Sequence, residues 1–277
     1  MAQTWHTTRF QLPLDRPLVM GIVNVTPDSF SDGGQHAGVA QAVAHARRLV
    51  DEGADILDIG GESSRPGAPV LAPDDEWARI EGVLRELVRW NVPVSVDTCK
   101  PEVMHRALDL GVDIINDIHA LDRPGALQVV AAHGQCGVCL MHMVGIPETM
   151  QSQAQYGDVV DEVRRYLGER VAEAEAAGVA RERLCLDPGI GFGKTPAHNL
   201  ALLRHQSALA ALGLPVLVGW SRKSTLGQVT GRPVEQRLAA SLAAALMGVQ
   251  HGARVVRVHD VAETVDVLKV WQAVASV

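Results

Sequence analysis

Short apolar runs alternate along the chain with longer segments in which apolar residues recur at helical spacing. The runs are three to six residues long, which suits strands rather than buried helices. They predict eight strands, over 18–23, 54–59, 92–96, 112–115, 137–141, 184–186, 215–219 and 255–258. The segments between them, such as 39–50 and 160–174, place apolar residues on one face, as helices that cover a sheet do. Successive strand ends lie about 34 residues apart, enough for a strand, a crossover helix and two loops.

Residues with special backbone preferences mark the ends of several predicted helices. Acidic residues 74–76 precede a helix that runs to Trp90, and Pro101 suits a first helical turn. Glycines stand where helices end before the next strand, at Gly53, Gly111 and Gly178. Residues 144–155 form an extra loop ahead of a long helix, and residues 9–15 suit a small hairpin or strand that closes one end of the sheet.

Two all-parallel architectures fit this order of elements. An open doubly wound sheet usually carries a glycine-rich phosphate turn after its first strand, but here the first turn reads NVTPD. Eight strands, with functional groups at nearly every strand end, favour a (β/α)8 TIM barrel with its active site at the C-terminal ends of the strands. Because no linker divides the chain, we expect one domain over 1–277, with 1–16 as a short N-terminal extension or hairpin.

Composition narrows the range of partners. With 277 residues, 47% of them hydrophobic and 21% charged, the chain can bury the core of one α/β barrel or of two small domains. A net charge of -7 argues against a broad nucleic-acid surface, and no apolar run approaches the roughly 18 residues of a membrane span. Residues 1–10 lack the pattern of a secretion signal. We therefore expect a cytoplasmic protein with small-molecule partners, neither nucleic acid nor membrane, and buried free thiols at Cys99, Cys136, Cys139 and Cys185.

Polar residues at three strand ends point to a binding pocket. Side chains alternate between the two faces of a strand, so Asp97 shares a face with Ser95, and Asn116 and Asp187 take equivalent positions. If the valines between them pack against helices, these three groups point into the barrel. They offer acceptors and an amide, a set suited to a flat heterocycle. The alternative is that they only hydrogen-bond to one another.

Cations gather at the ends of the last two strands. Residues 221–224 read SRKS, and Arg257 and His259 end the final strand, which is where barrels place a phosphate site. Arg65 adds a cation on the loop over 62–67. These groups predict an anion site, against the alternative of a solvated charged surface.

Two further features accompany strand ends. The loop over 186–194 places three glycines around Ile190 and Phe192, so that backbone and one aromatic ring can approach a ligand closely. His142 follows another strand and is interpreted mainly as a histidine satisfied by local hydrogen bonds.

Taken together, the motifs MGIVNVTPDSFSDGG, DIGGESSRPGA, SVDTCKPEV, IINDI, LMHM, LDPGIGFGKT, GWSRKS and RVHDVAETV resemble the dihydropteroate synthases of folate biosynthesis, in order and over almost the whole chain. The resemblance implies a pterin-binding (β/α)8 barrel. It also implies a transferase that joins (7,8-dihydropterin-6-yl)methyl diphosphate to 4-aminobenzoate, releases diphosphate and 7,8-dihydropteroate, and is a sulfonamide target.

The resemblance divides the site residues among three ligands. For the pterin it implies Asp97, Asn116, Asp187, Lys223 and Arg257. For the diphosphate it implies Asn24, Arg65, Ser224, Arg257 and His259, with Asn24 also meeting a magnesium ion, Mg2+. For 4-aminobenzoate it implies Phe30, Ser64, Pro66, Phe192, Ser221 and Lys223, brought together when the first two loops close. Ser64 stands where the family commonly has threonine, which reduces one methyl contact near the aminobenzoate ring.

The mechanism that the resemblance implies is dissociative. Arg257 and His259, with magnesium, neutralise the departing diphosphate, and Asp97 and Asp32 stabilise the pterin-methyl cation that the aryl amine then meets. Lys223 completes the predicted catalytic set, and loop closure excludes water.

Two rival functions share part of this pattern. A methyltetrahydrofolate:corrinoid methyltransferase shares the pterin barrel but has no diphosphate to bind, so the SRKS and RVH cations argue against it. A non-catalytic pterin-binding paralogue would be expected to lose loop residues, whereas Asn24, Asp32, Arg65 and Lys223 are present. The resemblance also implies a homodimer through the later helices, with the alanine-rich stretch 238–249 as a contact face or, alternatively, buried against the barrel.

Overall fold

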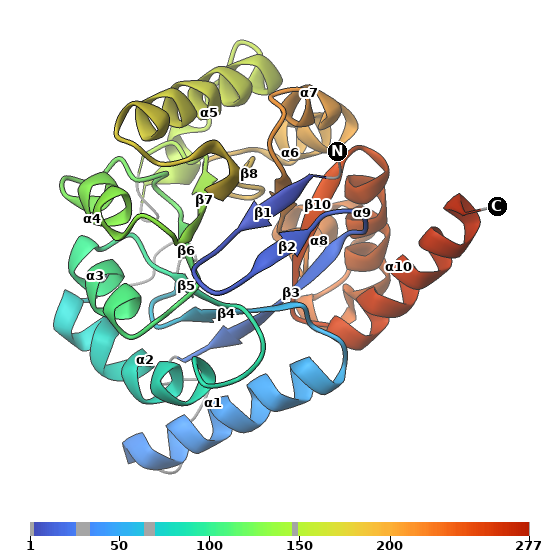
Figure 1. The fold of residues 1–277 in the computed structure, drawn as a ribbon. Coiled ribbons are helices and arrows are strands. Elements are labelled where there is room, and N and C mark those ends of the chain that lie inside the picture. Colours follow the sequence, from blue (N-terminus) through green and yellow to red (C-terminus); the bar gives the residue numbers. More distant parts are fainter. Residues whose placement is uncertain (1–2, 26–33, 64–69, 146–148, 277) are drawn as a thin grey trace.

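Eight parallel strands close into a barrel in a computed structural model that describes residues 3–25, 34–63, 70–145 and 149–276 (Figure 1). The strands are β3 (Leu18–Asn24), β4 (Ile56–Gly60), β5 (Val94–Asp97), β6 (Ile114–Asp117), β7 (Gly137–Met141), β8 (Leu184–Asp187), β9 (Val216–Val218) and β10 (Ala253–Val258). They pair in chain order, and β10 closes the ring against β3. Each predicted strand lies within two residues of an observed one, so the predicted (β/α)8 barrel is confirmed.

Helices follow the strands and form the outer ring (Figure 1). They are α1 (Gly34–Asp51), α2 (Pro73–Leu87), α3 (Pro101–Asp109), α4 (Ala126–His133), α5 (Val159–Ala176), α6 (Pro196–Arg204), α7 (Ser207–Ala210), α8 (Ser224–Thr230), α9 (Leu238–Gln250) and α10 (Val261–Ala275). Short 3-10 turns cover Met150–Gln153, Arg181–Arg183 and Val234–Gln236. The residue types predicted at the helix ends are confirmed. Three acidic residues lie in the first turn of α2, Pro101 opens α3, and Gly53, Gly111 and Gly178 have positive φ.

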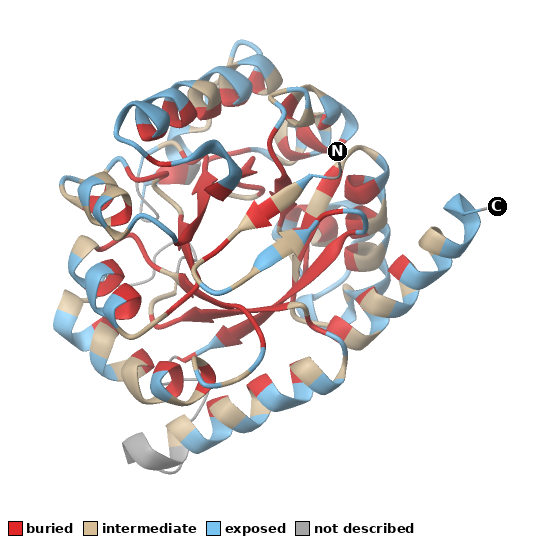
Figure 2. Cartoon of the chain, viewed as in Figure 1, coloured by how far each residue is buried: buried red, intermediate tan, exposed pale blue. Residues whose placement is uncertain are grey.

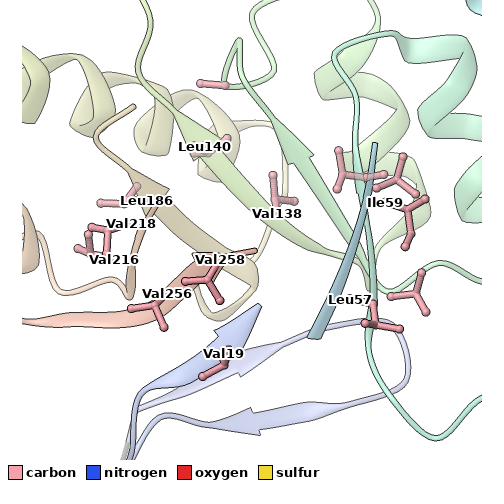
Figure 3. Packing of buried hydrophobic residues seen from close by; sticks show 14 of the residues in the cluster. Val19, Leu57, Ile59, Val138, Leu140, Leu186, Val216, Val218, Val256 and Val258 are labelled. Atoms are coloured by element: carbon pink, nitrogen blue, oxygen red, sulfur yellow. The ribbon is translucent and has the colours of Figure 1, made fainter. Parts of the chain in front are cut away.

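The strand side chains separate into two apolar layers, because successive residues of a strand face opposite ways. The layer between strands and helices includes Val19, Leu57, Ile59, Val138, Leu140, Leu186, Val216, Val218, Val256 and Val258 (Figure 3). The layer inside the barrel holds Leu18, Met20, Ile56, Ile114, Cys139, Cys185, Leu217 and Val255. Figure 2 shows the barrel strands mostly buried and the helices buried on the side that faces them. The interior is therefore packed with side chains, and ligands must bind at an end of the barrel.

A hairpin covers the amino-terminal end of the barrel. Strands β1 (Thr4–His6) and β2 (Gln11–Pro13) pair antiparallel, within the predicted N-terminal segment but starting earlier than the predicted stretch 9–15. Trp5 is fully buried against the inner layer, and its Nε1 donates a hydrogen bond of 2.9 Å to the Arg183 carbonyl. This end is closed by side chains, so the carboxyl-terminal end is left for a site.

Two further expectations can be compared with the described part of the chain. The four cysteines, Cys99, Cys136, Cys139 and Cys185, are buried and free, as predicted. Among the described helices, none combines the length and hydropathy that a membrane span requires.

Candidate active site

Strand register places three of the predicted site residues at one level of the barrel. Asn24 is paired with Gly60, Gly60 with Asp97, and Asp97 with Asn116 along β3, β4, β5 and β6. Gly60 contributes no side chain, so Asn24 and Asp97 face each other across it. A Cβ at Gly60 would lie 3.8 Å from Asn24 Oδ1 and 3.9 Å from Asp97 Oδ2. Two side-chain oxygens that can act as metal ligands therefore lie beside the space that a side chain at Gly60 would fill.

Arg257, from the last strand, meets two carboxylates at this level. Its Nε donates a hydrogen bond of 2.6 Å to Asp58 Oδ2, and its Nη2 donates one of 2.8 Å to Asp97 Oδ2. The partners lie 199 and 160 residues away in the chain, so only closure of the barrel brings them together. The predicted proximity of Asp97 and Arg257 is therefore observed.

Asp58 also belongs to this cluster, although it is not among the site residues predicted from the sequence. It is fully buried in β4, and the same Oδ2 accepts a hydrogen bond of 3.2 Å from Asn116 Nδ2. The signal that could have found it is the alternation within ILDIG, where Asp58 is the inward residue between Ile56 and Gly60. It was missed because it lies inside a strand rather than at its end.

Burial and charge change the proton affinities of this cluster. Burial raises the pKa of Asp97 to about 7, against the opposing effect of the Arg257 cation. Burial likewise raises the pKa of Asp187. Burial alone would lower the pKa of Arg257, but the facing carboxylates of Asp58 and Asp97 raise it, so the guanidinium stays charged. Perturbed carboxyl groups that converge on one cation are typical of functional sites.

A second group joins the loop after β9 to the end of β10. Ser221 Oγ lies 2.9 Å from His259 Nδ1 and accepts a hydrogen bond of 3.2 Å from the His259 backbone N–H. The next residue, Arg222, turns away and donates to Asp260 at 2.5 Å. Ser221 therefore orients His259, whereas Arg222 is held by a neighbouring carboxylate.

Asn24 and His259 line one groove, together with His45 and Arg48 of α1. Ser224 is exposed at the first turn of α8, directly after Lys223. Two of the groups that the resemblance assigns to the diphosphate, Asn24 and His259, thus share a groove at the ends of the neighbouring strands β3 and β10.

The glycine-rich loop after β8 is held from inside by Lys194. The Lys194 ammonium is buried and donates to the carbonyls of Gly189 and Phe192, both at 3.0 Å. It also donates to His142, at 2.9 Å to Nδ1 and 3.2 Å to the carbonyl. Burial lowers the pKa of Lys194 to about 7, and burial with the Lys194 charge lowers the pKa of His142 to about 3. His142 is thus a neutral acceptor, which agrees with its prediction as a locally satisfied histidine.

That loop carries Phe192 to the predicted aminobenzoate side of the site. Lys223 Nζ lies 4.3 Å from the centre of the Phe192 ring, over its face. Asp187, at the head of the loop, accepts a hydrogen bond of 2.7 Å from the Gly189 backbone N–H. The loop therefore connects the predicted pterin carboxylate with the predicted aminobenzoate ring contact.

A buried ion cluster stands beside Asp97. The Lys100 ammonium contacts the carboxylates of both Glu62 and Glu76, and Glu62 also accepts a hydrogen bond of 2.9 Å from the Leu71 backbone N–H. Burial would lower the pKa of Lys100, but its hydrogen bonds to Glu62 and Glu76 raise it. Lys100 therefore joins the end of β5 to both flanks of the segment 64–69, and the sequence analysis did not predict it.

The described residues offer oxygen donors rather than a preformed metal cage. No group of three or more His, Cys, Asp or Glu side chains suited to a metal occurs among them. The amide oxygen of Asn24, with Asp97 across Gly60, fits the way in which magnesium is usually held by one or two protein oxygens plus substrate phosphates.

Five predicted site residues lie outside the described residues. They are Phe30, Asp32, Ser64, Arg65 and Pro66.

The chain matches known proteins over nearly its whole length. Residues 20–259 match the family model of pterin-binding enzymes. Over 275 residues the chain is 54% identical to the dihydropteroate synthase of Neisseria meningitidis serogroup B, covering 97% of this chain and 96% of that protein.

Solved structures of similar sequence share the fold. A dihydropteroate synthase from Xanthomonas albilineans with 4-aminobenzoic acid is 53% identical, with a TM-score of 0.94 and complete coverage of both chains. The enzyme from the same organism in complex with 7,8-dihydropteroate is 52% identical, with a TM-score of 0.88 and coverage of 96% of this chain and 97% of that one.

Proposed function

The chain belongs to the pterin-binding enzymes as a dihydropteroate synthase, and from this premise we propose how its residues divide the work of joining a pterin to 4-aminobenzoate. In that reaction the pterin-methyl carbon loses diphosphate and gains the aryl amine nitrogen. The observation that carries the proposal is the meeting of Arg257 with Asp97 at the carboxyl-terminal end of the barrel, where β10 and β5 face each other.

The pterin lies against Asp97, Asn116 and Asp187, with the Arg257 guanidinium over its plane and Lys223 at its edge. Carboxylates accept from the ring N–H and amino groups, and the amide of Asn116 both donates and accepts. Support comes from the inward direction of these side chains and from the ion pair that holds Arg257 beside Asp97.

The diphosphate lies at Asn24, Ser224, Arg257 and His259, with Arg65 as a further predicted contact. The Ser221 hydroxyl, 2.9 Å from Nδ1, holds His259 at the end of β10, on the side of the barrel to which the diphosphate is assigned. Mg2+ held by the Asn24 oxygen and the phosphates would supply positive charge to the departing group.

The 4-aminobenzoate lies against Phe192 and Ser221, with Phe30, Ser64 and Pro66 as the predicted contacts outside the described residues. The aromatic ring of Phe192 is fixed by the glycine-rich loop and faces the Lys223 cation. Lys223 therefore touches both substrate positions and can align the aryl amine with the pterin-methyl carbon.

We propose a dissociative route. The C–O bond to diphosphate breaks first. Arg257 and His259 stabilise the negative charge that develops on the leaving oxygen. Asp97, together with the predicted Asp32, stabilises the pterin-methyl cation that results. The weakly basic amine then adds to the cation and loses one proton. No strong general base is needed on this route.

One experiment tests the function and a second tests the route. Purified protein with pterin diphosphate, 4-aminobenzoate and Mg2+ is expected to form 7,8-dihydropteroate; its absence from folded protein would favour the non-catalytic paralogue. For the second test, pterin diphosphate is labelled with 18O at the oxygen that joins the methyl carbon to phosphorus. It is then incubated with the protein in the absence of 4-aminobenzoate. A dissociative route moves label into non-bridging positions, whereas a concerted displacement leaves it in the bridge.

We also propose that residues 1–277 form one domain and that the protein is a homodimer. Exposed apolar residues on the adjoining helices α9 and α10, Leu238, Met247, Val270 and Val274, support this face as the contact. Sedimentation velocity should give twice the mass of the chain, and Val270→Glu with Val274→Glu should give the monomer; a monomeric parent protein contradicts the proposal.

A further inference from the structure

Asp58 is not one of the predicted site residues, yet it accepts hydrogen bonds from two of them, Arg257 and Asn116. It faces inward from β4, as Ile56 does, and is fully buried, so we place it behind the substrate rather than against it. One of its oxygens, Oδ2, accepts from both Arg257 Nε at 2.6 Å and Asn116 Nδ2 at 3.2 Å. A single carboxylate oxygen therefore joins β4 to β10 and to β6.

The second oxygen of Asp58 distinguishes it from a structural carboxylate. Among the residues that the structure describes, Oδ1 is buried and has no hydrogen-bond partner. Asp113, at the opposite end of the barrel, is equally buried and also ion-paired to an arginine, but each of its oxygens accepts at least two hydrogen bonds. A carboxylate kept for stability alone would be saturated, because an unsatisfied buried oxygen is costly.

The hydrogen bonds of Asp58 determine which atoms its partners can present. A carboxylate only accepts, so the amide nitrogen of Asn116 must face Asp58 and its Oδ1 is turned the other way, as an acceptor for a ring N–H. Arg257 uses Nε on Asp58 and Nη2 on Asp97, so two points fix the plane of the guanidinium. Its face and its Nη1 are left for the substrate.

We propose that Asp58 is a positioning residue that sets the plane of Arg257 and the orientation of the Asn116 amide for the pterin ring. This inference rests on the proposed pterin site. Asp58 acts only on the pterin half of the reaction, because neither of its two partners is assigned to 4-aminobenzoate.

The matched variants are Asp58→Asn and Asp113→Asn, which each convert a buried, arginine-paired carboxylate to an amide of the same shape. We expect Asp58→Asn to raise the KM for pterin diphosphate roughly 10- to 100-fold, the range for loss of a hydrogen bond to a charged group, and to change the KM for 4-aminobenzoate less than about threefold. Asp113→Asn should lower the melting temperature and leave both KM values near those of the parent enzyme. Equal rises in both KM values for Asp58→Asn, or a lower melting temperature alone, would overturn the proposal.

A double-mutant cycle tests whether Asp58 acts through Arg257. Calorimetry measures binding of pterin diphosphate to the parent protein, Asp58→Asn, Arg257→Ala and the double variant. We expect Asp58→Asn to weaken binding much less once Arg257 is absent, whereas fully additive effects would overturn this part of the proposal. If Arg257→Ala binds as tightly as the parent, the pterin site itself is misassigned; if Arg257→Ala binds poorly while Asp58→Asn binds normally, only the inference about Asp58 fails.

Discussion

Asp113 near the amino-terminal end of the barrel and Asp58 near its carboxyl-terminal end are both fully buried, and both accept hydrogen bonds from an arginine. At the first position Arg9 supplies three donors, and the Val94 backbone N–H supplies a fourth. At the second, Arg257 is shared between two carboxylates, and Asp58 keeps one oxygen without a partner in the described residues.

The difference separates a structural ion pair from a functional one. When both oxygens of a carboxylate already accept hydrogen bonds, as in Asp113, a ligand or a proton could bind there only by breaking those hydrogen bonds. The cluster around Arg257 also contains carboxyl groups whose pKa burial raises, at Asp97 and Asp187, and a ligand that donates hydrogen bonds to these two groups would stabilise it. The pterin, with several N–H groups on one flat edge, is the ligand that we propose for this cluster.

The largest expected effect is loss of activity at the carboxyl-terminal end. Arg257→Ala and Lys223→Ala should each reduce turnover by about 10³-fold or more, because Arg257 faces the negative charge that develops on the diphosphate and Lys223 aligns the two substrates. Far-UV circular dichroism should show an intact fold, since neither side chain belongs to the apolar core. Lys269→Ala, an exposed lysine on α10, is the control and should remain active. Normal diphosphate release by both site variants would contradict the assignment.

The opposite end should respond in stability and not in catalysis. Arg9→Met leaves Asp113 buried without its cation, so we expect the free energy of unfolding to fall by about 3 kcal/mol. Urea unfolding measures this loss, and both KM values of the folded enzyme should stay unchanged. A raised KM for pterin diphosphate would mean that the two ends are coupled and that the comparison is wrong.

The pH dependence of stability tests the raised pKa of Asp97 at the carboxyl-terminal end. Burial raises the pKa of Asp97 from 3.8 to about 7, so the folded state holds this proton more tightly than the unfolded chain. The contribution to stability is complete below the unfolded pKa and is lost as pH rises through the folded pKa, by up to about 4 kcal/mol for a shift of this size. Urea unfolding between pH 4 and pH 8 should therefore show a smaller decline for Asp97→Asn than for the parent. An unchanged decline would contradict the raised pKa.

A smaller effect is expected at Lys194, which holds the loop of Phe192. Lys194→Met leaves the carbonyls of Gly189 and Phe192 without their donor, so the KM for 4-aminobenzoate should rise about tenfold as the ring loses its fixed position. Steady-state kinetics measure the change, with Lys269→Met as the matched control. A lower melting temperature with an unchanged KM would show that Lys194 serves stability alone.

The sequence predicted the barrel well because apolar alternation and strand length are local properties. The pattern of Ser95 with Asp97, and of Cys185 with Asp187, required one residue in two to face inward, and the inner and outer apolar layers follow that rule. Asp97, Asn116 and Asp187 were predicted to point inward for the same reason.

Asp58, Lys194 and the Lys100 cluster could not be predicted in this way. Each acquires its role from partners on other elements: Asp58 from an arginine 199 residues away, Lys194 from a histidine 52 residues away, and Lys100 from Glu62 and Glu76. No spacing along the chain encodes such a contact.

By itself, the sequence determined that eight parallel strands alternate with helices and which strand residues face inward, and its resemblance to the dihydropteroate synthases indicated the reaction. Only the tertiary structure decided which charges pair and which are left for substrate, as with Arg257 on Asp58 and Asp97, Arg222 on Asp260, and Ser221 on His259. The reason is physical: the inward direction of a side chain follows from local backbone geometry, whereas hydrogen bonds and proton affinities depend on distance and burial, which exist only once the barrel has closed.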